Sequence, residues 1–326
     1  MRRKTTAETG RALATAFLGA LFLIPASAAA APTRLRVLAA GTLARPFREI
    51  DALFSRRHQN VVVEPQFGGS VKMAREITEL HEPADIIAVA DYSVIPKYLF
   101  AQGRGPAYAR WYAGFARNAI TFAYTAKSRF AGRITVKNWY RVLARRHVAI
   151  GRSNPDTDPS GYQTLQMLSL AAKYYAAPGL AARILANAPK RNMRDTETSL
   201  ISALELGEID YLAIYRSDSL QHRFRYLALP AKIDLSDPAY AGFYKRAVVQ
   251  TKNGAVSGRP IVYAATIVKG AAHPKLAAQY LRLLFGQRGQ KVMEKNGFLS
   301  LSPAPAEGLE AMPALLRPLV KPWPGS

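Results

Sequence analysis

The chain of 326 residues contains no cysteine, and this absence excludes disulfide bonds and thiolate metal sites. The fold must therefore be held together by its apolar core. Long apolar runs are also lacking: residues 12–25 form the most apolar stretch, and they are fewer than the roughly twenty residues that a membrane-spanning helix needs. Acidic residues are scarce, with 22 aspartates and glutamates against 45 lysines and arginines.

Several motifs that carry chemistry are missing as well. The sequence has no Gly-x-Ser-x-Gly nucleophile elbow, no Gly-x-Gly-x-x-Gly loop and no Walker lysine motif. Its histidines are spread along the chain without the spacing of a metal site. We therefore expect a protein that is not an enzyme and needs no cofactor.

The N-terminal residues have the pattern of a secretory signal. Basic residues flank the start, the apolar stretch 12–25 follows, and residues 26–31 are small residues suited to cleavage. We expect residues 1–31 to be a signal peptide and the rest to be exported to the periplasm. No cysteine follows the apolar stretch, so a lipid anchor has no attachment residue.

The charge balance is strongly basic. The formal net charge is +23, and it is +20 without residues 1–31, which hold four basic residues and one acidic residue. Such a charge can attract anions, nucleic acid or membrane phosphate. Export argues against nucleic acid, and the basic residues are not interleaved with the aromatic side chains of a stacking platform. A solvated surface and a general attraction of anions both remain open.

The apolar periodicity predicts an α/β fold. Residues 34–91 read as β-α-β-α-β, and the apolar run 85–90 is typical of a parallel strand covered on both faces. A second α/β unit spans about 119–220, and a closing helix covers 274–285. The length suits two lobes, because single domains usually have ~100–200 residues.

Four helix starts carry polar side chains that could surround one anion. Asp158 is predicted to be the N-cap of a long helix with Pro159 in its first turn, after an apolar strand. Thr42 and Ser70 follow the first two strands, and Glu197 lies at another helix start. Helix N-termini offer free backbone N–H groups and a partial positive charge, which favour an anion.

A set of short motifs resembles the extracytoplasmic molybdate/tungstate-binding proteins of ABC transporters, in the mainly archaeal branch that coordinates the oxyanion with carboxylates. The motifs follow one another in order along almost the whole chain after residue 31. They lie at residues 41–43, 68–72, 77–80, 84–92, 138–140, 158–162, 207–211, 214–215, 260–263 and 296–298.

The resemblance implies the type II periplasmic-binding-protein fold, in which two lobes close over the ligand and each lobe is a mostly parallel sheet flanked by helices. Lobe one would comprise residues 32–118 and 269–326, and lobe two residues 119–268. The implied function is a receptor that captures tungstate or molybdate and delivers it to an ABC permease driven by an ATPase subunit. We expect a monomer that binds no nucleic acid.

The resemblance also implies the ligand-binding residues. The family's two hydroxyl ligands fall on Thr42 and Ser70, its carboxylates on Asp158 and Glu197, and a tyrosine that points at the anion on Tyr215. Two departures stand out. Thr42 replaces the usual serine and keeps its hydroxyl donor, and a serine at position 160 stands where the motif often has cysteine.

Two carboxylates would repel a dianion unless they bond its metal centre directly or donate a proton. Asp158 and Glu197 are therefore expected to be ligands of the molybdenum or tungsten. Sulfate and phosphate centres do not expand their coordination in this way. Three alternatives remain: a receptor for sulfate, phosphate or an organic acid, an exported enzyme that uses Asp158 and Glu197 as an acid–base pair, and two carboxylates that only begin helices.

Overall fold

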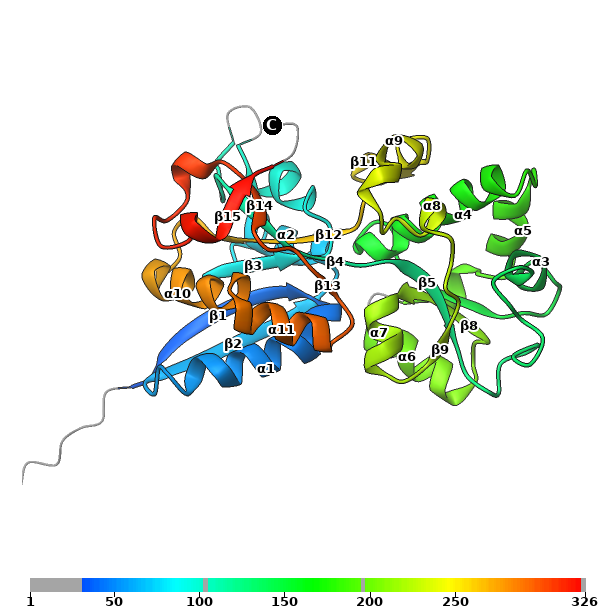
Figure 1. Ribbon diagram of the computed structural model, residues 1–326, viewed down its shortest axis with the longest axis horizontal. Coiled ribbons are helices and arrows are strands. Elements are labelled where there is room, and N and C mark those ends of the chain that lie inside the picture. The colour runs from blue at the N-terminus through cyan, green and yellow to red at the C-terminus, as the bar shows by residue number, and fades with distance from the viewer. Residues whose placement is uncertain (1–30, 102–104, 195–196, 324–326) are drawn as a thin grey trace, which may run out of the picture. The chain divides into compact units, whose positions relative to one another are not determined.

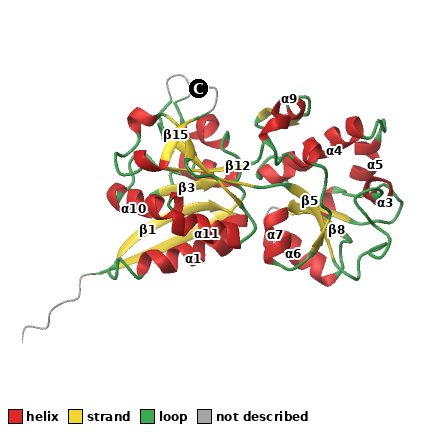
Figure 2. Ribbon diagram, viewed as in Figure 1, coloured by secondary structure: helices red, strands yellow, loops and turns green. Residues whose placement is uncertain are grey.

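The computed structural model describes residues 31–101, 105–194 and 197–323. The predicted signal peptide falls almost entirely on residues 1–30, which lie outside the described residues. The described residues form two large sheets flanked by helices and one separate two-stranded hairpin (Figure 1, Figure 2). Among the described residues, no helix combines the length and the apolar character that crossing a membrane requires.

The larger sheet begins with the predicted β-α-β-α-β pattern. Its parallel strands β1 (Thr33–Ala40), β2 (Val61–Gly68) and β3 (Ile86–Val89) are joined through α1 (Ala44–Ser55) and α2 (Ser70–Thr78). The sheet is completed by β4 (Tyr112–Arg117), β12 (Val262–Ile267), β13 (Leu299–Ser300), β14 (Ala304–Glu307) and β15 (Val320–Pro322).

Helix α1 follows from the spacing of its apolar side chains. Phe47, Ile50 and Phe54 recur at helical spacing and are buried. They face the core formed with α10 (Pro274–Phe285) and α11 (Gln287–Lys295), and Tyr280 packs edge-on against both phenylalanine rings. Burying each such side chain contributes roughly 1.5–3 kcal/mol. This packing fixes where the N-terminal end of α1 points.

The smaller sheet has the order β7–β6–β8–β5–β9. Strands β7 (Met193–Arg194), β6 (Ile150–Ser153) and β8 (Tyr211–Tyr215) are parallel neighbours. Strand β5 (Ile120–Tyr124) runs antiparallel to both of its neighbours, β8 and β9 (Arg225–Tyr226). Its helices are α3 (Trp139–Leu143), α4 (Pro159–Tyr174), α5 (Leu180–Ala186), α6 (Glu197–Leu206), α7 (Arg216–Gln221), α8 (Ala231–Asp234) and α9 (Ala241–Tyr244).

The chain passes between the sheets twice. It crosses first between β4 and β5, at residues 118–119. It crosses again after the hairpin of β10 (Val248–Thr251) and β11 (Gly254–Ser257), where β11 leads into β12 (Figure 1). Because β12 pairs with β3 and β4, residues 262–267 belong to the larger sheet. The lobe boundary predicted at residue 268 assigns residues 262–267 to lobe two instead.

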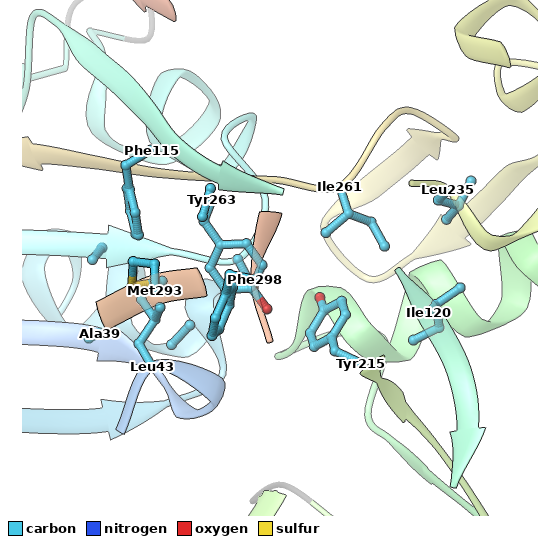
Figure 3. Close-up of a cluster of buried hydrophobic side chains, with 14 of the residues drawn as sticks. Ala39, Leu43, Phe115, Ile120, Tyr215, Leu235, Ile261, Tyr263, Met293 and Phe298 are labelled. Carbon is cyan, nitrogen blue, oxygen red and sulfur yellow. The ribbon is translucent and has the colours of Figure 1, made fainter. Parts of the chain in front are cut away.

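Both sheets are mixed, whereas the sequence predicted mostly parallel ones. The crossing strands β4, β12 and β5 supply the antiparallel neighbours. The core is continuous at the crossings: Ile120, Tyr215 and Ile261 lie beside Tyr263 and Phe298 (Figure 3). The rings of Tyr215 and Tyr263 are 5.9 Å apart between centroids. Apolar packing therefore surrounds the polypeptide segments about which the lobes would move.

Candidate functional site

Polar residues follow the carboxyl ends of adjacent strands in both sheets. In the larger sheet Thr42 follows β1, and Ser70 follows β2. In the smaller sheet Asp158 follows β6, and Asp218 follows β8, which is the parallel neighbour of β6. Carboxyl ends of parallel strands share one edge of a sheet, where ligands of open α/β folds bind.

The two predicted hydroxyl residues are buried at the edge of the larger sheet. Thr42 lies in the 3-10 turn η1 (Gly41–Leu43), and its Oγ1 is 3.0 Å from the Tyr263 hydroxyl. Ser70 begins α2, and its Oγ accepts a 2.9 Å hydrogen bond from the Ala90 backbone N–H. In the described residues, no side chain caps η1 or α2. The first N–H groups of η1 and α2 therefore have no side-chain acceptor among the described residues, and a helix N-terminus of this kind favours an anion.

Asp158 is the N-cap of α4, as predicted, with Pro159 in the first position of the helix. Its Oδ1 accepts a 2.9 Å hydrogen bond from the Ser160 N–H. Burial raises the pKa of the Asp158 carboxyl, while hydrogen bonds from Ser160 and Ser153 act in the opposite direction. Asp158 is thus a buried acid held in place by its own helix.

Asp218 is a candidate site residue that the sequence did not predict. It lies in α7 and is buried, and its Oδ2 has no hydrogen-bond partner among the described residues. Burial raises its pKa well above the ordinary 3.8, and the negative charge of Asp158 raises it further. Two buried carboxyl groups that repel each other therefore share one site.

The other two predicted ligands are Glu197 and Tyr215. Glu197 begins α6, directly after β7 at the same edge of the smaller sheet, but its side chain lies outside the described part of the structure. Its role stays a prediction. Tyr215 is buried at the end of β8, and its hydroxyl donates a 2.8 Å hydrogen bond to Gln163 Oε1. In this arrangement the Tyr215 hydrogen is already engaged within the protein.

A cavity of about 650 Å³ lies between these strand ends, and Thr42, Ser70 and Tyr215 are not among its described lining residues. Asp158 and Asp218 line it together with the backbone at Gly41 and Gly69, and Arg45 and Arg48 of α1 add positive charge. The remaining lining residues are Ala44, Phe67, Gly68, Thr198, Ile201, Ser202, Glu205, Gln221 and His222. Glycine backbone, two guanidinium groups and the carboxyl groups of Asp158, Asp218 and Glu205 thus border one space, which suits an anion whose centre can also accept oxygen ligands.

Contacts across the cavity join the two lobes. Arg45 Nη1 in α1 donates a 2.6 Å hydrogen bond to the carbonyl of Gln221 in α7. The Lys72 N–H of α2 lies 3.2 Å from the Thr157 carbonyl, which precedes α4. A Cβ added to Gly69 would lie only 2.4 Å from that same carbonyl oxygen. The lobes are therefore closed on each other at this point, and the contact requires glycine.

The raised pKa values predict a pH dependence of stability. Each of the two carboxyls binds its proton more tightly in the folded than in the unfolded protein, so stability falls as pH rises from about 3.8 towards the folded pKa. For each group, every pH unit of that window removes at most about 1.4 kcal/mol. Urea unfolding of ligand-free protein between pH 4 and pH 7 should show a shallower decline for Asp218→Asn than for wild type. If the unfolding free energies of wild type and Asp218→Asn changed equally with pH, the burial of Asp158 and Asp218 in one site would be contradicted.

Residues 35–299 match a family model described as bacterial extracellular solute-binding protein. The chain belongs to this family. A relative from Petrotoga mobilis, named an uncharacterized solute-binding protein, is 37% identical over 291 residues, covering 87% of this chain and 89% of its own.

Two further relatives of this solute-binding protein carry a more specific name. The molybdate/tungstate-binding protein WtpA of Pyrococcus abyssi is 34% identical over 304 residues, covering 84% of this chain and 87% of its own. The protein of the same name from Thermococcus kodakarensis is also 34% identical over 304 residues, covering 85% and 84%.

Solved structures match the fold. The periplasmic molybdate-binding protein of Azotobacter vinelandii has a TM-score of 0.60 at 19% identity, covering 81% of this chain and 98% of its own. The sulfate-binding protein SubI of Mycobacterium tuberculosis has a TM-score of 0.57 at 13% identity, covering 89% and 94%. At such identities these likenesses concern the two-lobed α/β fold.

Proposed function

We propose that this solute-binding protein captures tungstate or molybdate between its lobes in the periplasm and delivers it to an ABC permease with its ATPase subunit. The observation that carries the proposal is the pair of buried carboxyl groups, Asp158 and Asp218, which line one cavity; Asp218 Oδ2 accepts no hydrogen bond from the part of the chain that the structure describes. The molybdate/tungstate-binding relatives agree with it.

The carboxylate pair suits an oxometalate better than sulfate. A tetrahedral dianion offers only acceptors, so ionised carboxylates beside it are repelled unless they bond its central atom, and a protonated carboxyl can only donate one hydrogen bond to it. Tungsten and molybdenum accept additional hard oxygen ligands, and Asp158 and Asp218 can supply them. The helix N-termini at Gly41 and Ser70 then provide donors for the oxo groups.

Ligand binding would close the lobes and would not lead to a chemical reaction. The ligand contacts residues of both lobes, so its binding energy favours the closed arrangement, which a permease can distinguish from the open one. No step in this function breaks or forms a covalent bond in the protein. Glu197 remains a candidate third carboxylate from the parallel neighbour of β6.

Competition calorimetry tests the choice of ligand. Tungstate and molybdate should bind and displace each other, whereas sulfate and phosphate should bind at least about a hundredfold more weakly, roughly 2.7 kcal/mol. The difference arises because only the metal centres turn the two carboxylates from repulsive into attractive groups. Equal affinity for sulfate would overturn the proposal in favour of a general anion receptor.

A further inference from the structure

A second cavity, of about 370 Å³, lies apart from the carboxylate site. In the described part of the chain, none of its lining residues lines the first cavity. Its walls come from both lobes: α2 and the turn η2 (Ile95–Leu99) on one side, α4 and the hairpin β10–β11 on the other. Its volume falls in the range of roughly 300–1,000 Å³ typical of small-molecule sites.

Two cations line this second cavity. They are Lys97 of η2 and Arg259, which follows β11, and no acidic residue is among the described lining residues. Burial and the charge of Arg259 both lower the pKa of Lys97, so the two cations are close enough to repel each other. The nearby Asp91 accepts hydrogen bonds from the Ser93 N–H and the Tyr162 hydroxyl, and its negative charge raises the pKa of both cations, so it offsets part of their repulsion without lining the cavity.

The rest of the wall is largely apolar. Val71, Val94, Pro96 and Val256 line it, with the ring of Tyr98 beside them. An inorganic ion alone would leave this surface uncovered. A ligand with one charged group and a short apolar body would satisfy both kinds of wall.

We propose that this cavity binds a small organic anion, whose carboxylate or phosphate group lies between Lys97 and Arg259 and whose apolar body packs against Val71, Val94 and Val256. A guanidinium group binds carboxylate or phosphate through two parallel hydrogen bonds, and a lysine ammonium adds a point charge with three donors. The anion also removes the repulsion between the two cations.

Such a ligand would join the lobes. Lys97 Nζ already donates a 2.6 Å hydrogen bond to the carbonyl of Asn253 in the hairpin, and Tyr162 of α4 donates to Asp91 after β3. The hairpin is in turn held to the loop before α4, because Asn253 Nδ2 donates to the Asp156 carbonyl. An anion bound here therefore favours closure, and by linkage it raises the affinity of the carboxylate site for its own ligand.

The test uses the full exported chain with benzoate, phenyl phosphate and neutral benzamide as probes. Calorimetry should detect binding of at least one of the two anions and none of benzamide. Saturating anion should raise the affinity for tungstate about threefold, a coupling of roughly 0.7 kcal/mol. Binding of only one anion identifies whether carboxylate or phosphate is recognised. Failure of both anions overturns the proposal, as does a probe that competes with tungstate.

A charge variant locates the site. Lys97→Gln should lower the affinity for the bound anion about tenfold, and the anion concentration that saturates wild type should no longer raise the tungstate affinity threefold. The double variant Lys137→Gln, Arg146→Gln removes two exposed cations of the second lobe and should change neither affinity. Equal losses in both variants would assign the effect to net charge and overturn the site. Because tungstate binding is measured separately, a failure here leaves the proposed function standing.

Discussion

Asp218→Asn should lower the affinity for tungstate by about a hundredfold, or roughly 2.7 kcal/mol, while raising the stability of the ligand-free protein. Asparagine keeps the shape of the side chain but offers a neutral amide oxygen in place of an anionic metal ligand. At the same time it removes the repulsion from Asp158 and the cost of burying a second carboxylate. Calorimetry and urea unfolding at pH 7 measure the two effects.

The affinity for sulfate distinguishes the loss of a metal ligand from general damage to the site, because damage would weaken the binding of both anions. Removing a negative charge should leave weak sulfate binding unchanged or stronger, so the preference for tungstate should fall. The matched control is Asp51→Asn: burial raises the pKa of Asp51 to about 6, but this residue bonds Tyr280 and lies outside the cavity lining. If Asp218→Asn binds tungstate as tightly as wild type, Asp218 is not a ligand.

Gly69→Ala should weaken tungstate binding by at least about tenfold without unfolding the protein. The backbone of Gly69 has φ −61° and ψ 132°, which alanine adopts without strain. The new methyl group would nevertheless lie 2.4 Å from the Thr157 carbonyl oxygen of the other lobe. The lobes would then close incompletely, and the carboxylates would lie too far from the bound ion to coordinate it.

Small-angle scattering with and without tungstate separates blocked closure from a direct clash with the ligand. Wild type should become more compact on binding, and Gly69→Ala should change less at saturating tungstate. Gly132→Ala is the control, because no atom lies within 4 Å of its added methyl group. An unchanged affinity and full compaction in Gly69→Ala would show that the contact with Thr157 does not limit closure.

The local backbone structure around Asp158 could be predicted from the sequence. The apolar run before Asp158, the N-cap itself and Pro159 predicted a strand-to-helix turn, and the structure has it. Gly207 follows the last residue of α6 with φ +80°, a conformation that glycine adopts readily at a helix end. These features depend on residues within one turn of each other, so local sequence is sufficient to specify them. The α/β pattern up to residue 91 is local in the same sense.

Only the tertiary structure decided which acid accompanies Asp158. The first turn of α7 carries Asp218, and acids are common in first turns for dipole reasons, so nothing in that segment distinguished it. It meets Asp158 because β8 pairs in parallel with β6, an order that no local pattern encodes. Likewise, β12 belongs to the larger sheet and the proline-rich end of the chain pairs as β14 with β4, since hydrogen bonds to distant strands outweigh weak local preferences.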